Sequence, residues 1–390
     1  MLKEKTRKQF QNLQLSPMLK MFNATQKYTN LINLGVGEPD LDSPKEVLEV
    51  ARQSIQDGYT HYPPMTGYMD LRQEICNYWE THHGLKRQPQ EVIVTAGAIQ
   101  ALYLILSTFI DPGDEVIVSD PCFPSYINQV KFLGGRLTAV PVEEKDGFNL
   151  TADQIEACIT PKTKVLILNS PGNPTGAVLS REEMLKIAAV VEKHDIYVIS
   201  DEIYEALIYG EEHVSFATMP GMMERTFTVA GFSKTYAMTG WRLGYIMCDS
   251  RFIPALSVLS TDTVMGVNAV TQRAGYVALK DCRYFVDKMN ALYSRRIAYT
   301  SELINKTPGL SCIRPKGSFY IMANISQTGM SSVDFSMKML EEARVVVMPG
   351  VSFGENGDSF VRISCNGSED VLNEAFDRMK QAMNGQPFKG

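Results

Sequence analysis

The middle of the chain alternates short, almost continuously apolar runs with stretches that have helical periodicity. The runs are Glu91–Thr95, Glu115–Ser119, Arg136–Val142, Lys164–Asn169, Ile196–Asp201, Thr226–Ala230 and Leu243–Met247. A continuous apolar run is typical of a strand buried on both faces, whereas a strand with one face in water alternates. Because the spacing between several runs leaves room for crossover helices, the pattern predicts an α/β fold with a mostly parallel central sheet and helices on both faces.

At 390 residues the chain is too long for one simple core, and its pattern changes after about residue 275. A long helical pattern, Tyr276–Thr307, leads into strand-like runs and a final helix after Glu369. We therefore expect three parts: an N-terminal segment that packs with the small domain (1–44), a large α/β domain (45–275) and a small C-terminal α+β domain (276–390).

Polar and aromatic residues collect where the predicted strands end. These residues are Gly97 and Ala98 after the first run, Phe123 after the second, Asn173 after the fourth, Asp201 and Tyr204 at the fifth, and Ser233 and Lys234 after the sixth. In open parallel sheets, ligands bind outside the carboxyl ends of the strands. We therefore expect five strand ends to bring these residues to one crevice.

The collected residue types match the needs of pyridoxal phosphate, although each has a commoner interpretation alone. A lysine amine such as that of Lys234 forms a Schiff base with an aldehyde. Asp201 could pair with a protonated pyridine nitrogen, but an aspartate at a strand end is often a helix cap. Backbone N–H groups at Gly97 and Ala98 could bind a phosphate, and Arg242 could add countercharge or be a surface arginine.

A longer match supports this interpretation. The segment Gly231–Tyr245, GFSKTYAMTGWRLGY, resembles the lysine signature of class I and II aminotransferases, which are pyridoxal-phosphate enzymes of fold-type I. Five further segments are similar to that family in order and spacing: LGVGEPD, YPPMTGYMDLR, NSPGNPTG, SDEIYE and FVRIS. Together they span nearly the whole chain, and they look closest to the aromatic-amino-acid and aspartate-type members.

The resemblance implies a cofactor role for each collected residue. Lys234 would form the Schiff base and then move a proton, with Asp201 as the partner of the pyridinium nitrogen. The other implied contacts are Asn173 and Tyr204 to the ring oxygen, Phe123 to the ring face, and Gly97, Ala98, Ser233 and Arg242 to the phosphate. Gly231 stands where many relatives carry a hydroxyl residue, so one phosphate contact is expected to be missing or replaced.

The resemblance also implies how substrate binds. Arg362 would clamp the α-carboxylate, because a guanidinium fork matches a planar carboxylate, with Asn173 and the backbone N–H of Gly35 beside it. Tyr62 matches a tyrosine that reaches the cofactor phosphate of the neighbouring subunit. The expected protein is therefore a homodimer with shared active sites.

Residue 99 bears on the substrate. In one aspartate-specific subgroup the matching position is a lysine that pairs with the second carboxylate of the substrate, and Ile99 cannot do this. We therefore expect an aromatic or neutral L-amino acid as donor and a 2-oxo acid such as 2-oxoglutarate as acceptor. An acceptor with two carboxylates would still need a distal partner, which the sequence does not identify.

Three other interpretations stay open. A carbon–sulfur β-lyase would use the same lysine and arginine on the same fold, and an aspartate-preferring aminotransferase would differ only in its donor. A protein without pyridoxal phosphate is the third. Gly350–Gly354 matches the GxSxG pattern of hydrolases, but no histidine follows it, so Ser352 is predicted to be a loop residue.

The bulk composition excludes several partners. A net charge of −6 does not favour binding to nucleic acid, which is itself negatively charged. No apolar stretch is long enough to cross a membrane. The seven cysteines are odd in number and contain no CxxC pair, which argues against a disulfide framework or a metal site. The first ten residues, MLKEKTRKQF, lack the apolar core of a signal peptide, so we expect a cytoplasmic enzyme.

Overall fold

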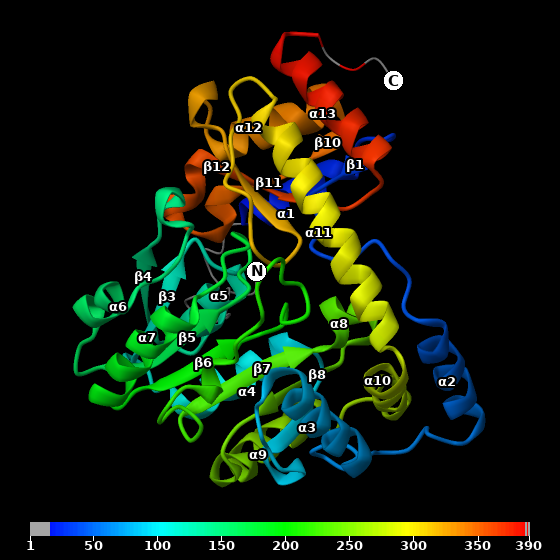
Figure 1. Ribbon diagram of the computed structural model, residues 1–390, viewed down its shortest axis with the longest axis vertical. Coiled ribbons are helices and arrows are strands. Elements are labelled where there is room, and N and C mark those ends of the chain that lie inside the picture. The colour runs from blue at the N-terminus through cyan, green and yellow to red at the C-terminus, as the bar shows by residue number, and fades with distance from the viewer. Residues whose placement is uncertain (1–15, 387, 389–390) are drawn as a thin grey trace, which may run out of the picture.

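The computed structural model describes residues 16–386 and residue 388. The first ten residues, on which the signal-peptide expectation rests, lie outside this part. Figure 1 shows a large sheet in the lower half of the molecule and smaller sheets above it, with the long helix α11 running alongside. Within the part described, no helix combines the length and apolar character needed to cross a membrane.

The large sheet has seven strands in the order β2-β8-β7-β6-β5-β3-β4. Their bounds are β2 Val92–Thr95, β3 Glu115–Asp120, β4 Arg136–Pro141, β5 Thr163–Asn169, β6 Tyr197–Asp201, β7 Thr226–Gly231 and β8 Gly244–Met247. The neighbours from β7 to β4 are parallel, and β8 runs antiparallel to both β7 and β2. All seven predicted strands are confirmed within a residue or two of their predicted ends.

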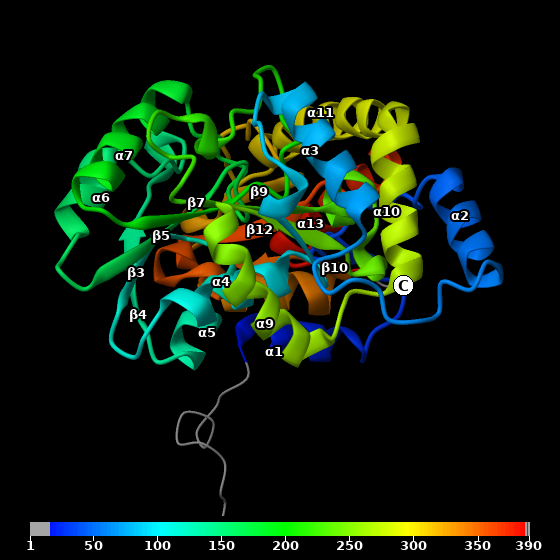
Figure 2. The same cartoon turned by 90° about the horizontal axis from the view of Figure 1, so that it is seen from below.

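Helices cover both faces of this sheet because alternate strand residues point to opposite sides. In β3, Val116 and Val118 join a core with α4, α5 and α9, whereas Ile117 joins a core with α6 and α7. The helix bounds are α4 Ala98–Phe109, α5 Pro124–Phe132, α6 Ala152–Cys158, α7 Arg181–Lys193 and α9 Ile253–Val264. Figure 2 shows the two helix layers on either side of the sheet, which confirms the predicted architecture.

The rest of the chain forms a second α+β region. Its strands are β1 Ile32–Asn33, β9 Tyr320–Asn324, β10 Val345–Val346, β11 Met348–Pro349 and β12 Phe360–Ser364. They make a parallel pair, β1-β10, and an antiparallel sheet in the order β11-β12-β9. Its helices are α1 Pro17–Thr25, α11 Arg283–Asn305, α12 Ser332–Lys338 and α13 Glu369–Met383.

The N-terminal segment belongs spatially to this second region. Residues Ile32 and Asn33 of β1 pair with Val345 and Val346, and Met21 of α1 packs in a core with Leu340. The remaining helices are α2 Lys45–Gln56, α3 Met69–His83, α8 Phe232–Thr235 and α10 Ala269–Asp281. The boundary expected near residue 275 falls inside α10, and the division of the chain into domains is kept as a proposal.

Candidate active site

A cavity of about 250 Å³ lies where the carboxyl ends of the central strands face the second region. Its lining comes from both regions: Met18, Phe22, Gly37, Ala98, Ile99, Leu102, Phe123, Tyr126, Asn169, Asn173, Asp201, Ile203, Tyr204, Ser233, Lys234, Thr239, Arg242, Tyr320 and Arg362. The strand ends therefore converge as the sequence pattern predicted. A cavity of this size suits a small molecule rather than a macromolecule.

Lys234 projects into this cavity from the short helix α8, which directly follows β7. Its Nζ donates a hydrogen bond to the Gly37 carbonyl at 2.5 Å. Burial lowers the pKa of the Lys234 amine to about 8, and the positive charge of Arg362 acts in the same direction. About a tenth of this amine is therefore unprotonated at pH 7, far more than for an ordinary lysine, and only the unprotonated amine is a nucleophile for an aldehyde.

Asp201 ends β6 and is buried beneath the cavity. The Tyr126 hydroxyl donates to Asp201 Oδ2 at 2.6 Å, and the Ile203 N–H donates to Asp201 Oδ1 at 3.2 Å. Burial raises the pKa of this carboxyl to about 6, although both hydrogen bonds lower it. Within the described part of the chain no cation pairs with Asp201, so its charge is available to a cationic ligand.

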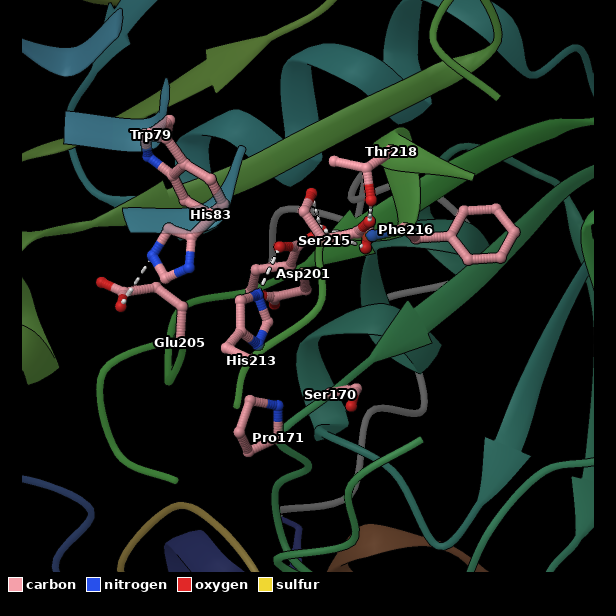
Figure 3. Close-up of polar contacts among 12 residues, drawn as sticks. Trp79, His83, Ser170, Pro171, Asp201, Glu205, His213, Ser215, Phe216 and Thr218 are labelled. Carbon is pink, nitrogen blue, oxygen red and sulfur yellow. Dashed lines mark hydrogen bonds and ion pairs between the residues drawn. The ribbon is translucent and has the colours of Figure 1, made fainter. Parts of the chain in front are cut away.

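Two buried glutamates, Glu202 and Glu205, hold the turn that carries Asp201 and Tyr204. Figure 3 shows Glu205 beside His83. Glu202 accepts hydrogen bonds from Ser200, Ser215 and the Phe216 N–H, and it lies 2.7 Å from His213 Nε2. Glu205 accepts from Tyr78 and from Thr235, the residue after Lys234, and lies 3.5 Å from His83 Nε2. Both sides of the Asp201–Tyr204 turn are therefore fixed by carboxylates that point away from the cavity.

On the opposite wall, β12 brings Arg362 into the site. Its Nη1 donates to Asn173 Oδ1 at 3.0 Å, and its Nη2 donates to the Gly35 carbonyl at 2.7 Å. Its Nε is buried and has no protein partner among the described residues. A buried guanidinium with spare donor capacity is suited to a carboxylate ligand.

The start of α4 forms a second anion site. Its first N–H groups have no partner within the helix, and Arg242 and Ser233 line the same cavity. Gly97, the cap of α4, has φ of 79°, and a Cβ on it would lie 2.5 Å from Arg242 Nη2. Glycine at this position therefore allows the guanidinium to sit against the helix terminus, as a phosphate site requires.

Gly35 and Tyr62 differ from the other expected site residues, because neither is free to make its expected contact in the cavity of this chain as it stands. The Gly35 N–H donates to Asn33 Oδ1 at 3.0 Å, so its expected donation to a substrate carboxylate stays a prediction that requires this bond to be exchanged. Tyr62 does not line the cavity of its own chain, and 77% of its surface is exposed. Its expected role concerns a neighbouring subunit.

Tyr126 and Tyr320 were missed by the sequence interpretation. Tyr126 lies three residues after Phe123, on α5, and no motif marks it as a partner of Asp201. Tyr320 begins β9, and its hydroxyl lies 3.2 Å from that of Tyr204. Both contacts join segments distant in sequence, 75 and 116 residues apart, so only the fold brings them together.

Pyridoxal phosphate fits this set of groups. Its aldehyde would meet the amine of Lys234, its pyridinium nitrogen the unpaired carboxylate of Asp201, and its phosphate the α4 terminus with Arg242. The second guanidinium, Arg362, is left for a carboxylate of the substrate. The fold and the site together define a pyridoxal-phosphate-dependent transferase of fold-type I.

Comparison with known proteins gives the family. The family model "Aminotransferase class I and II" matches residues 29–379, so the chain belongs to this family, whose members use pyridoxal phosphate. An aromatic-amino-acid aminotransferase 2 from Thermococcus litoralis is 38% identical over 94% of this chain and 95% of its own length. An aspartate aminotransferase from Pyrococcus abyssi is 40% identical over 94% and 95%.

Solved structures agree with the sequence comparison. The crystal structure of an aromatic aminotransferase from Pyrococcus horikoshii superposes with a TM-score of 0.89, at 41% identity, over 94% of this chain and 99% of that one. The fold-type I assignment and the aminotransferase assignment made from the sequence are therefore confirmed.

The Gly97 geometry predicts a specific loss of cofactor binding. In Gly97→Ala the added Cβ must displace Arg242, and a φ of 79° with a ψ of 166°, a region essentially confined to glycine, adds strain of about 1–3 kcal/mol. We expect the dissociation constant for pyridoxal phosphate to rise about tenfold or more, as measured by absorbance titration of the apoprotein. Gly58→Ala is the control for a methyl group at positive φ, because Gly58 has φ of 82° with nothing within 4 Å of the added Cβ. Equal affinities in the two variants would contradict this account.

The lowered pKa of Lys234 predicts how cofactor uptake depends on pH. Only the unprotonated amine attacks the aldehyde, so the uptake rate of the apoprotein should rise with pH, with a midpoint near pH 8, and level off about one unit above it. Stopped-flow absorbance between pH 6 and pH 11 measures this profile, with Lys234→Ala as the blank. A midpoint near the ordinary lysine pKa of about 10.4 would show that burial does not lower the pKa.

Proposed function

We propose that this aminotransferase moves the amino group of an aromatic or other neutral L-amino acid to a 2-oxo acid such as 2-oxoglutarate, whose distal carboxylate would need a partner from outside the described lining of the cavity. The observation that carries the donor preference is the apolar wall of the cavity. Four of its side chains come from two helices: Met18 and Phe22 of α1, and Ile99 and Leu102 of α4. Such a wall favours an apolar substrate side chain by removing its surface from water.

The charges of the cavity support the same preference. Among the described residues of its lining, the cations are Lys234, Arg242 and Arg362. In the proposal these serve the aldehyde, the phosphate and the α-carboxylate in turn, which leaves no cation for a second carboxylate. Ile99, which is 46% exposed, lines the cavity. By the resemblance it stands at the position of the lysine in the aspartate-specific subgroup, which supports the same preference.

The proposed mechanism assigns one task to each group. The bound pyridoxal phosphate supplies an electron sink that weakens the Cα–H bond of the amino acid. Lys234 Nζ would take the proton from the substrate Cα and hold it until it is returned to the bound amino group's carbon framework, and the Asp201 carboxylate would hold a proton on the pyridine nitrogen of the cofactor. Arg362 and Asn173 orient the carboxylate, so that the Cα–H bond faces the lysine.

Further proposed contacts complete the cofactor site. Asn173 and Tyr204 hydrogen-bond the ring oxygen, and Phe123 covers the ring face. Ser233, Arg242 and the backbone at Gly97 and Ala98 hold the phosphate. All of these residues except Gly97 line the cavity. Asn173, Tyr204, Ser233 and Arg242 also stand in the family-like segments, which supports their assignments.

We further propose a cytoplasmic homodimer in which Tyr62 reaches the cofactor phosphate of the partner subunit. The exposed Tyr62 lies at a hollow that is also lined by Val264 and Met265, two partly exposed apolar residues. Exposed apolar groups around a hollow are typical of an interface. The cytoplasmic part of the proposal is supported by the seven cysteines, all of which are free thiols.

The donor preference is tested by single-turnover kinetics. We expect phenylalanine to convert the bound cofactor at least about tenfold more efficiently than aspartate, measured by absorbance as the half-reaction proceeds. Ile99→Lys should raise the efficiency with aspartate about tenfold or more, because a hydrogen bond to a charged group contributes about 1.5–3 kcal/mol. Ile99→Met, similar in size but uncharged, is the control. Equal or faster conversion of aspartate by the unchanged protein would favour the aspartate-preferring alternative.

A further inference from the structure

Tyr320 touches two functional groups of the cavity that come from different parts of the fold. It is buried at the start of β9, which pairs with β12, the strand that carries Arg362. The Tyr320 ring lies 4.3 Å from Arg362 Cζ, and its hydroxyl lies 3.2 Å from the Tyr204 hydroxyl. One side chain therefore connects the proposed carboxylate clamp with the proposed ligand of the ring oxygen.

The backbone at Gly37 lies close to the Tyr320 hydroxyl. A Cβ at Gly37 would lie 2.6 Å from this oxygen, so the glycine leaves space for the hydroxyl. The Gly37 carbonyl also accepts the hydrogen bond from Lys234. The Tyr320 hydroxyl therefore lies next to the backbone segment that holds the reactive amine.

The ionisable groups that influence the pKa of Tyr320 are Arg362, Tyr204 and Glu38. Burial raises the pKa of the Tyr320 phenol, so this side chain stays a neutral donor and acceptor near neutral pH. Its ring face is directed at the Arg362 guanidinium, an arrangement that is attractive because the ring face is electron-rich. The two contacts use different parts of one side chain.

The hydroxyl contact can run in either direction. In this structure Tyr204 donates to Tyr320, but a phenol has one donor and two acceptor positions and its proton can rotate. When Tyr204 donates to the ring oxygen of the cofactor, Tyr320 is the neighbour that can donate to Tyr204 in turn. Hydrogen bonds in such a chain strengthen one another.

We propose that Tyr320 is a positioning residue with two separable parts: its hydroxyl directs the proton of Tyr204 toward the cofactor, and its ring holds the Arg362 guanidinium for the substrate carboxylate. The proposal rests on the proposed roles of Tyr204 and Arg362. A phenylalanine at this position would keep the ring contact and lose only the hydroxyl, so the two parts can be tested independently.

The hydroxyl is tested by the pH titration of the visible absorbance of the holoenzyme. A hydrogen bond donated to the ring oxygen stabilises its anionic form, so weakening that bond moves the titration midpoint upward. In Tyr320→Phe we expect an upward shift of about 0.5–1 pH unit. In the Tyr204→Phe background the same substitution should add no further shift, because its effect passes through Tyr204.

The ring is tested by the binding of 3-phenylpropionate, a carboxylic acid without an amino group, followed through the same absorbance. Tyr320→Phe should bind it within about twofold of the unchanged protein, whereas Tyr320→Leu should bind it at least about threefold more weakly. The control for loss of a hydrogen-bonded tyrosine hydroxyl is Tyr299→Phe, since the partly buried Tyr299 donates to Asn373 in the second region and does not line the cavity. It should change neither measurement.

Each outcome decides one part of the proposal. An unchanged midpoint in Tyr320→Phe, with a shift in Tyr204→Phe, overturns the role of the hydroxyl. Equal affinities of Tyr320→Phe and Tyr320→Leu overturn the role of the ring. If Tyr204→Phe itself leaves the midpoint unchanged, the proposed contact of Tyr204 with the ring oxygen fails, and the proposal for the hydroxyl fails with it.

Discussion

A buried amine among positive charges is the constraint on which the rest of this active site depends. Lys234 lies in a cavity with two guanidinium groups, and burial lowers its pKa to about 8. An ordinary exposed lysine would be almost fully protonated near neutral pH and a poor nucleophile. The site therefore requires a fold that removes this side chain from water and still leaves space for a ligand.

The fold meets this requirement by placing groups on strand ends and fixing them from behind. β6 and β7 are parallel neighbours, so Asp201 and the helix that carries Lys234 emerge at the same edge of the sheet. Glu205 then accepts a hydrogen bond from Thr235, which joins the turn after β6 to the helix after β7. The second region supplies Arg362 and Tyr320 from adjacent strands, so the proposed substrate end of the cavity is built by a different sheet from the proposed cofactor end.

Much of this arrangement could be predicted from the sequence. The features that could not be predicted are contacts between segments that are distant along the chain. Continuous apolar runs identified all seven central strands, and their ends located Lys234 and Asp201 correctly in one cavity. Tyr126 and Tyr320 were not predicted, because the sequence pattern around a buried tyrosine does not reveal whether its hydroxyl forms a hydrogen bond. The sequence also did not show that β8 runs antiparallel to β7. The connection between the two strands carries the Lys234 segment, and its length alone does not reveal the direction of the strand that follows.

The most direct test of the central claim is reduction of the holoenzyme with borohydride, followed by peptide mapping with mass spectrometry. A Schiff base between the cofactor and Lys234 would be fixed as a stable pyridoxyl group on the peptide that contains Gly231–Tyr245. The account predicts one such group per chain, on Lys234. A reduced pyridoxyl group on another lysine, or none at all in protein that carries the cofactor, would contradict it.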